Sequence, residues 1–280
     1  MYNSFFGFKE NPFNQTPDST FFFPSEKHKS ALDAVLYAIR QRKGFALVTG
    51  EIGSGKTTVV RTLLRRLGDS VQTAVITNTH VSPKGILYLL MEDLAIPYQM
   101  GTKEKLLIQL NEYLLRQASD DKTVVLLIDE AQNLTPRCLE EVRMLSNLET
   151  EKEKLIQIVL VGQPELRNKV EMPRLEQLRQ RIAIHYHIHP LTESETRDYI
   201  MHRLNRVRSE DQWIDPVFNA DALAAVYRFS RGIPRLINLL CDHALLTGCL
   251  EEMRVITPFI IEETISELRF RGEKRYEQVY

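Results

Sequence analysis

The sequence has few cysteines, no long apolar run and almost no net charge, and each of these absences excludes a class of protein. Its three cysteines, Cys138, Cys241 and Cys249, form neither a CxxC pair nor a zinc-binding spacing. So sparse a set is typical of a reducing compartment and not of a disulfide scaffold. The longest apolar runs, residues 124–128 and 158–161, fall far short of the roughly 20 residues that a membrane-spanning helix needs.

The amino terminus and the charge balance show no export signal and no global preference for nucleic acid. Residues 1–13 contain aromatic side chains but no continuous apolar region, so they do not resemble a signal peptide. The 36 Lys and Arg residues balance 37 Asp and Glu residues, which leaves a net charge of −1. We therefore expect a cytoplasmic chain without a membrane segment, placed at the cytoplasmic face of the inner membrane if the native chain continues past Tyr280.

The order of apolar segments predicts two folded parts preceded by an arm. Short apolar strands alternate with amphipathic helices, which predicts an α/β body with a parallel sheet and helices on both faces. After Pro190 the pattern contains only helices, which predicts a small all-helical lid. Residues 1–24 are too rich in Phe to remain in water, and we expect them to form an ordered arm without helical period, packed on the body. The predicted domains are the arm at 1–24, the body at 25–190 and the lid at 191–280. The predicted strands are residues 45–49, 71–77, 124–128, 156–161 and 182–189, and the predicted lid helices are residues 193–208, 220–230, 234–248 and 257–269.

A glycine-rich segment between the first predicted strand and the next helix fits the pattern GxxxxGK[ST] in full. Glycines allow successive backbone N–H groups to surround a phosphate, and the N-terminus of the following helix adds a favourable dipole. Lys56 is expected to reach the β- and γ-phosphates of ATP, and the Thr57 hydroxyl to bind Mg²⁺. The predicted nucleotide-binding residues are Gly50, Glu51, Ile52, Gly53, Ser54, Gly55, Lys56, Thr57 and Thr58.

Polar residues follow two other predicted strands, at the positions where open α/β sheets bind ligands. Asp129 and Glu130 come directly after the apolar strand at 124–128. Asp129 is expected to hold Mg²⁺ through water, and Glu130 to polarise the water that attacks the γ-phosphate. Gln163 follows the fourth strand, and it either orients the attacking water or the γ-phosphate or simply forms a turn before Pro164.

Two arginine positions suggest charge stabilisation of the reaction. Arg174, Arg179 and Arg181 precede the fifth strand, where one of them either reaches the ATP of a neighbouring subunit as an arginine finger or belongs to a solvated helix face. We favour Arg181 over Arg179, because Arg181 directly precedes the first apolar residue of the strand. Arg235 begins a lid helix, from which it either contacts the γ-phosphate on lid closure or remains at the surface.

With these motifs placed, the chain resembles an AAA+ ATPase, and more narrowly the ATPase domain of the ExeA-type, or general secretion pathway protein A, family. Nearly the whole chain takes part in the resemblance. It rests on six blocks in order: the arm motifs at residues 4–8, 11–13 and 16–18, the loop at 49–57, and the segments at 128–134, 145–150, 161–166 and 232–238.

The resemblance implies a five-stranded sheet and a helical lid with ATP at their junction, and an arm close to the adenine. It also implies sensor roles for Gln163 and Arg235, a finger near Arg181, and assembly into a homo-oligomer. Relatives of the secretion type continue past the lid into a membrane helix and a peptidoglycan-binding domain. This chain stops at Tyr280, which puts the secretion role in question and leaves the ATPase assignment intact.

Three functions compete for this chain. The first is an ATPase that serves envelope machinery such as type II secretion, pili or polysaccharide export, with an inner-membrane component as partner. The second is a DNA-associated regulator similar to transposon target-selection ATPases, for which Arg203, Arg206 and Arg208 form a weak basic stripe beside Glu210 and Asp211. The third is a nucleotide-gated binding module, which the presence of Glu130 opposes.

Overall fold

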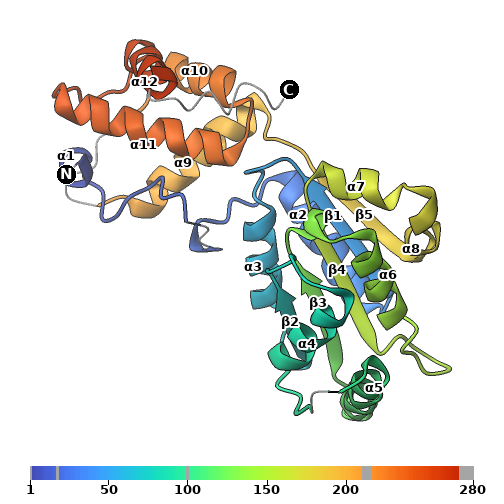
Figure 1. Cartoon of the computed structure of the whole chain (residues 1–280). Helices are drawn as coiled ribbons and strands as arrows, with labels where there is room; N and C mark the ends of the chain where they lie inside the picture. Colours follow the sequence, from blue (N-terminus) through green and yellow to red (C-terminus); the bar gives the residue numbers. More distant parts are fainter. Residues whose placement is uncertain (1, 17–18, 99–100, 210–215, 271–280) are drawn as a thin grey trace. The chain divides into compact units, whose positions relative to one another are not determined.

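The computed structural model describes residues 2–16, 19–98, 101–209 and 216–270, and it is shown in Figure 1. The chain forms two compact units, divided at Pro190. The sheet unit contains residues 26–52 and 56–189, and the helical unit contains residues 1–25, 53–55 and 190–280. Pro17 and Asp18 of the arm, and Glu210 and Asp211, lie outside the described residues. Among the helices that are described, none combines the length and the apolar character needed to cross a bilayer.

The sheet unit is built on five parallel strands, as the alternating pattern predicts. The strands lie in the order β2-β3-β4-β1-β5, which Figure 1 shows. The three inner strands are buried along almost their whole length, because helices cover both faces of the sheet. The edge strands β2 and β5 are only partly buried. The strands are β1 (Phe45–Gly50), β2 (Val71–Ile76), β3 (Thr123–Ile128), β4 (Ile156–Gly162) and β5 (Ile182–Ile188).

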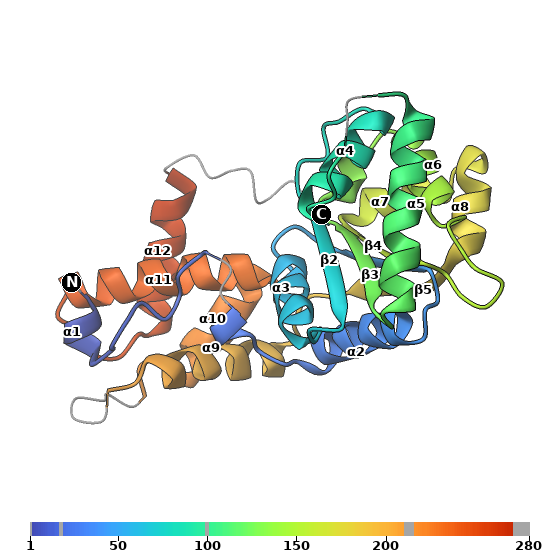
Figure 2. The ribbon, with the colours of Figure 1, turned by 90° about the horizontal axis from the view of Figure 1, so that it is seen from below.

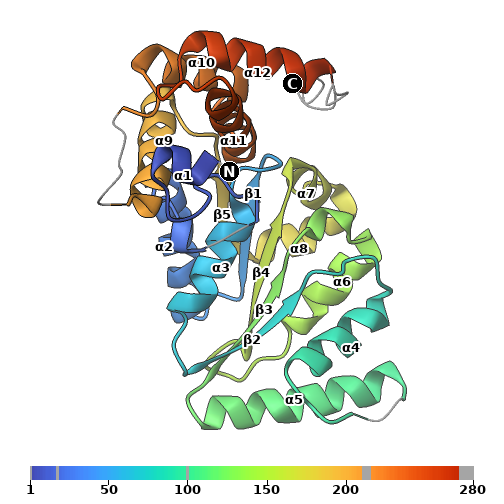
Figure 3. The same cartoon turned by 90° about the vertical axis from the view of Figure 1, so that its left-hand side faces the viewer.

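Two sets of helices cover the two faces of this sheet, as Figure 3 shows. Helices α2 and α3 contact each other and strand β1, and α2 also contacts β5. The larger apolar core joins the other face to α4, α5, α6, α7 and α8. Ser82 and Thr135 cap α4 and α6, since each hydroxyl accepts a backbone N–H of its helix, whereas Thr102 before α5 makes no such bond. The helices are α2 (Glu26–Arg40), α3 (Lys56–Arg66), α4 (Pro83–Asp93), α5 (Lys103–Ser119), α6 (Pro136–Leu145), α7 (Pro164–Val170) and α8 (Glu176–Arg181).

The helical unit encloses a second core, to which the aromatic arm contributes. The arm packs against the helices of the helical unit (Figure 2), whereas its sequence suggested packing on the body. It also begins with a short helix, α1 (Tyr2–Phe6), which the sequence did not predict because five residues are too few to reveal a helical period. Tyr2 and Phe6 lie four residues apart and are both buried, and α1 contacts α11. The other helices are α9 (Glu193–Val207), α10 (Ala220–Ser230), α11 (Pro234–Leu250) and α12 (Pro258–Phe270).

A buried arginine of α9 connects the arm to this core. The side chain of Arg203 is only 5% exposed. Its guanidinium donates hydrogen bonds to the carbonyl of Pro12 (2.5 Å), the carbonyl of Asn14 (3.3 Å) and the hydroxyl of Tyr199 (2.8 Å). It also lies 4.7 Å from the centre of the Phe21 ring. Arg203 therefore binds the arm and is not displayed on a basic stripe.

Replacing Arg203 with Met should destabilise the helical unit. The change leaves two arm carbonyls without their charged donor, and we expect the free energy of unfolding to fall by about 2–3 kcal/mol. Urea denaturation measures this loss, and chymotrypsin should cut the aromatic arm faster in the variant. Arg206→Met is the matched control, because Arg206 lies on the same helix and is exposed. Equal effects of the two substitutions would contradict the role of Arg203 in holding the arm.

Candidate nucleotide site

The phosphate loop connects the carboxyl end of β1 to the first residue of α3, as its sequence predicts. Lys56, which begins α3, is only 6% exposed. Its ammonium donates hydrogen bonds to the carbonyls of Gly50 (2.7 Å) and Glu51 (2.9 Å). Burial lowers the pKa of Lys56, and the nearby carboxylates of Glu130 and Asp129 oppose this shift. A buried cation that is hydrogen-bonded to two neutral carbonyls is well suited to receive an anion such as a phosphate.

Gly53 lies in the middle of this loop and belongs to the helical unit. Its φ of +78° is a conformation that favours glycine. Within the helical unit, its carbonyl accepts the N–H of Arg235 at 3.3 Å, and a Cβ added at Gly53 would lie 2.6 Å from the Cβ of Arg235. Arg235 is an exposed residue in the first turn of α11. The glycine thus permits a close backbone approach to the predicted sensor arginine.

The acidic pair follows β3, and its first member contacts the phosphate-loop helix. The Thr57 hydroxyl donates to a carboxylate oxygen of Asp129 at 3.2 Å. Burial raises the pKa of the Asp129 carboxyl, while the hydrogen bond from the N–H of Glu130 opposes this shift. The two oxygen groups predicted to bind Mg²⁺ therefore lie together. Their chemistry fits the ion, because Mg²⁺ commonly takes one or two protein oxygens together with substrate phosphates.

The second acid, Glu130, is held in an unusual conformation. Its φ of +51° and ψ of +36° lie in the left-handed region, which non-glycine residues rarely adopt. Three bonds hold this backbone: the N–H of Glu130 donates to Asp129 Oδ1 (2.9 Å), and its carbonyl accepts from the Thr79 hydroxyl (3.3 Å) and the N–H of Asn133 (3.0 Å). The carboxylate of Glu130 accepts a hydrogen bond from the side-chain amide of Gln163 at 3.2 Å. The structure thus brings together the two polar groups that follow β3 and β4.

The strand order explains why these motifs meet. Strand β4 lies between β3 and β1, with Ile128 opposite Leu160 and Thr49 opposite Gly162. The strands are parallel, so their carboxyl ends lie side by side. They form what is called here one edge of the sheet, as distinct from its edge strands β2 and β5. The acidic pair, the Gln163 turn and the start of the phosphate loop consequently occupy neighbouring positions on that edge.

Three residues of this edge were missed by sequence reasoning. The side chain of Gln132 contacts both Glu130 and the Gln163 turn, the Thr79 hydroxyl contacts the Glu130 carbonyl, and Lys169 binds carbonyls of the loop after Glu130. Gln132 lies within the segment at 128–134 that supports the family resemblance, which was the available signal. Thr79 and Lys169 belong to no recognisable pattern, and only the folded structure brings them to the site.

The arginines before β5 lie at the opposite edge, which is formed by the amino ends of the strands. Ile182, the residue after Arg181, pairs with Phe45 at the amino end of β1, whereas Gly50 pairs with Ile188. Six residues of strand separate these edges, which is roughly 20 Å at the rise of a parallel strand. Arg181 is therefore remote from the phosphate loop of its own sheet unit.

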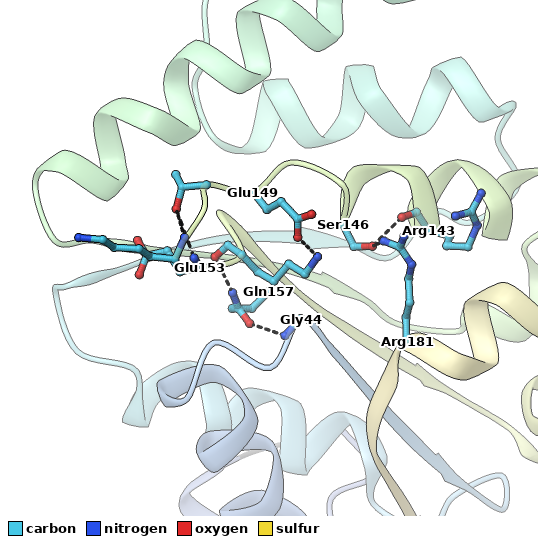
Figure 4. A network of polar contacts seen from close by, with 10 residues as sticks. Gly44, Arg143, Ser146, Glu149, Glu153, Gln157 and Arg181 are labelled. Atoms are coloured by element: carbon cyan, nitrogen blue, oxygen red, sulfur yellow. Dashed lines mark hydrogen bonds and ion pairs between the residues drawn. The ribbon is translucent and has the colours of Figure 1, made fainter.

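Arg181 is nevertheless held in a defined position, as Figure 4 shows. Its guanidinium donates to the hydroxyl of Ser146 at 2.6 Å, and that hydroxyl donates to the carbonyl of Arg143 at 2.7 Å. Arg179 instead pairs with Glu176 on its own helix at 3.9 Å, with both side chains more than half exposed. Arg174 contacts the sulfur of Met172. Of the three candidates, Arg181 is the one whose guanidinium is hydrogen-bonded to the end of another helix, at the C-cap of α6.

Comparison with protein families matches residues 39–170 to the AAA domain family. General secretion pathway protein A of Aeromonas hydrophila is 41% identical over 249 residues, which cover 89% of this chain and 45% of that protein. The chain thus spans less than half the length of this relative.

Solved structures show the same fold at low sequence identity. The ADP form of the ORC2 protein of Aeropyrum pernix has a TM-score of 0.66 and 15% identity, over 93% of this chain and 73% of that chain. Cdc6p of Pyrobaculum aerophilum has a TM-score of 0.64 and 19% identity, over 95% and 70% of the two chains. The RuvB Holliday junction branch migration motor of Thermotoga maritima has a TM-score of 0.57 and 18% identity, over 87% and 69%.

The parallel sheet, the phosphate loop after β1, the acidic pair after β3 and the AAA-domain match over residues 39–170 together define a P-loop protein of the AAA+ ATPase class. Within that class, the sequence is similar to general secretion pathway protein A, the relative with 41% identity. The resemblance found in the sequence is thereby confirmed.

Proposed function

We propose that the chain is a Mg²⁺-dependent ATPase that works as a homo-oligomer in envelope machinery. The observation that carries the chemical part is the meeting of Lys56, Thr57, Asp129 and Glu130 at one edge of the sheet. The observation that supports the oligomer is the position of Arg181 at the opposite edge.

In this proposal each residue of the edge has a distinct task. The N–H groups of residues 50–58 and the Lys56 ammonium bind the phosphates of ATP. The Thr57 hydroxyl and Asp129 would hold Mg²⁺, which neutralises phosphate charge when bound. Glu130 takes a proton from the attacking water, and Gln163 orients that water or the γ-phosphate. Arg235 contributes positive charge to the γ-phosphate from the first turn of α11.

Arg181 acts in trans in this proposal. A side chain at the amino ends of the strands cannot reach a γ-phosphate bound at their carboxyl ends, about 20 Å away. The ATP of a neighbouring subunit is therefore the target that its charge can stabilise. This role requires a homo-oligomer, and it makes turnover per subunit depend on protein concentration.

The envelope role rests on the relative. The Aeromonas protein is named for the general secretion pathway, and the shared 41% identity extends over 89% of this chain. We propose type II secretion, pilus assembly or polysaccharide export as the process, an inner-membrane component as partner, and the cytoplasmic face of the inner membrane as the location. The DNA-associated alternative loses support because Arg203 is buried against the arm. Export should fail in cells whose only copy carries Lys56→Ala.

Replacing Lys56 with Ala should abolish tight ATP binding. The change removes the buried ammonium at the centre of the loop, and we expect the affinity for ATP to fall by at least about 100-fold, since two or more charge-assisted bonds are lost. Titration with a fluorescent ATP analogue measures it. Lys105→Ala is the matched control, because Lys105 is an exposed lysine of the same unit. Unchanged affinity in a folded Lys56→Ala protein would refute the phosphate-loop assignment.

A further inference from the structure

The loop after β3 contains a glutamine whose side chain bridges two groups of the site. The side-chain N–H of Gln132 donates to Glu130 Oε2 at 2.5 Å. Its carbonyl oxygen accepts the backbone N–H of Gln163 at 3.1 Å. One half-buried amide therefore uses both of its ends, one on the proposed catalytic carboxylate and one on the turn after β4.

The surroundings of Gln132 are shaped to hold it in this position. A Cβ added at Gly162 would lie 2.7 Å from the side-chain oxygen of Gln132 and 3.2 Å from its backbone nitrogen, so the approach requires glycine. From the other side, the ammonium of Lys169 donates to the carbonyls of Gln132 (2.5 Å) and Leu134 (2.9 Å). Residues of two elements, β4 and α7, thus fix the loop that carries Gln132.

A second glutamine of the same unit provides a comparison. Gln157, near the amino end of β4, is also bonded at both ends: it accepts the N–H of Gly44 at 2.8 Å and donates to the carbonyl of Lys154 at 3.1 Å (Figure 4). Both of its partners are backbone groups, so its role is to close the fold. Gln132 differs because one of its partners is the carboxylate of Glu130.

We propose that Gln132 is a positioning residue for ATP hydrolysis. Its amide holds Oε2 of Glu130, together with the amide of Gln163, and leaves the other carboxylate oxygen to accept a proton from water. The same amide fixes the backbone of Gln163, so the carboxylate and the sensor turn keep one relative geometry. This inference rests on the proposed role of Glu130 as the base.

Replacing Gln132 with Met tests the inference, because Met keeps the length of the side chain and removes both bonds. We expect kcat to fall about tenfold, with the KM for ATP and the affinity for an ATP analogue within about twofold of wild type. Gln132→Glu keeps an acceptor for the N–H of Gln163 but cannot donate to Glu130, and it should be at least as slow. Gln157→Met is the matched control, which should lower thermal stability and leave kcat per folded protein unchanged.

Single-turnover rates in double variants then separate positioning from folding. Gln132→Met should cause a smaller loss in a Glu130→Gln background than in wild type, because the bonded carboxylate is already absent and only the bond to the N–H of Gln163 is left to remove. The inference would be overturned if Gln132→Met or Gln132→Glu turned over ATP at the wild-type rate. It would also be overturned if the losses of rate were additive in the double variant. If Glu130→Gln itself keeps wild-type turnover, the proposed function fails instead, so the two failures are distinguishable.

Discussion

A Glu130→Gln protein is expected to bind ATP normally and to hydrolyse it on the order of 10²–10⁴ times more slowly than wild type. The amide has the shape of the carboxylate but cannot accept a proton from water. The backbone bonds of residue 130 to Asp129 and Thr79 do not involve the side chain of Glu130 and should survive the change. The substitution therefore removes chemistry while it preserves the site.

Two measurements define this result. Steady-state phosphate release reports turnover, and titration with a fluorescent ATP analogue reports binding. Glu171→Gln is the matched control, since Glu171 is a half-exposed carboxylate of the same unit that pairs with Arg167 at 3.0 Å. Turnover of Glu130→Gln within about threefold of wild type would show that another group is the base.

An Arg181→Ala protein is expected to bind ATP normally and to lose on the order of 10³-fold in turnover, the effect of an arginine that stabilises a phosphoryl transition state. The anchor at Ser146 gives the guanidinium a defined direction at the edge opposite the phosphate loop. Arg179→Ala is the matched control. Arg179 is more than half exposed and pairs with Glu176 on its own helix, so its loss should change turnover little.

Mixing variants tests whether Arg181 acts between subunits. An Arg181→Ala subunit keeps an intact phosphate loop, and a Lys56→Ala subunit keeps an intact Arg181. Neither protein alone should turn over ATP well, but their mixture should regain part of the activity. If the mixture shows no recovery and turnover per subunit does not depend on concentration, then Arg181 has no role in trans.

Much of the fold could be predicted because its elements have strong local patterns. The strand at 124–128 is apolar throughout, which matches its burial as an inner strand of the sheet. Helix α6 begins with a proline that follows a capping threonine, a local pattern that is typical of a helix start. No bounds could be predicted for the short helices α1, α7 and α8, because five to seven residues do not show a reliable period. The packing of the arm in the helical unit also depends on a contact far along the chain, with Arg203.

The chemistry proposed for this protein can be predicted from short local patterns of the sequence: a phosphate loop, an acidic pair and the alternation of strands and helices. Which of these patterns meet depends on the tertiary fold. The insertion of β4 between β3 and β1 brings Gln163 to Glu130 and Gln132, and the pairing of β5 with β1 places Arg181 at the amino ends of the strands. Strand order and register are set by the burial of the whole apolar sheet, to which residues far apart in the sequence contribute together.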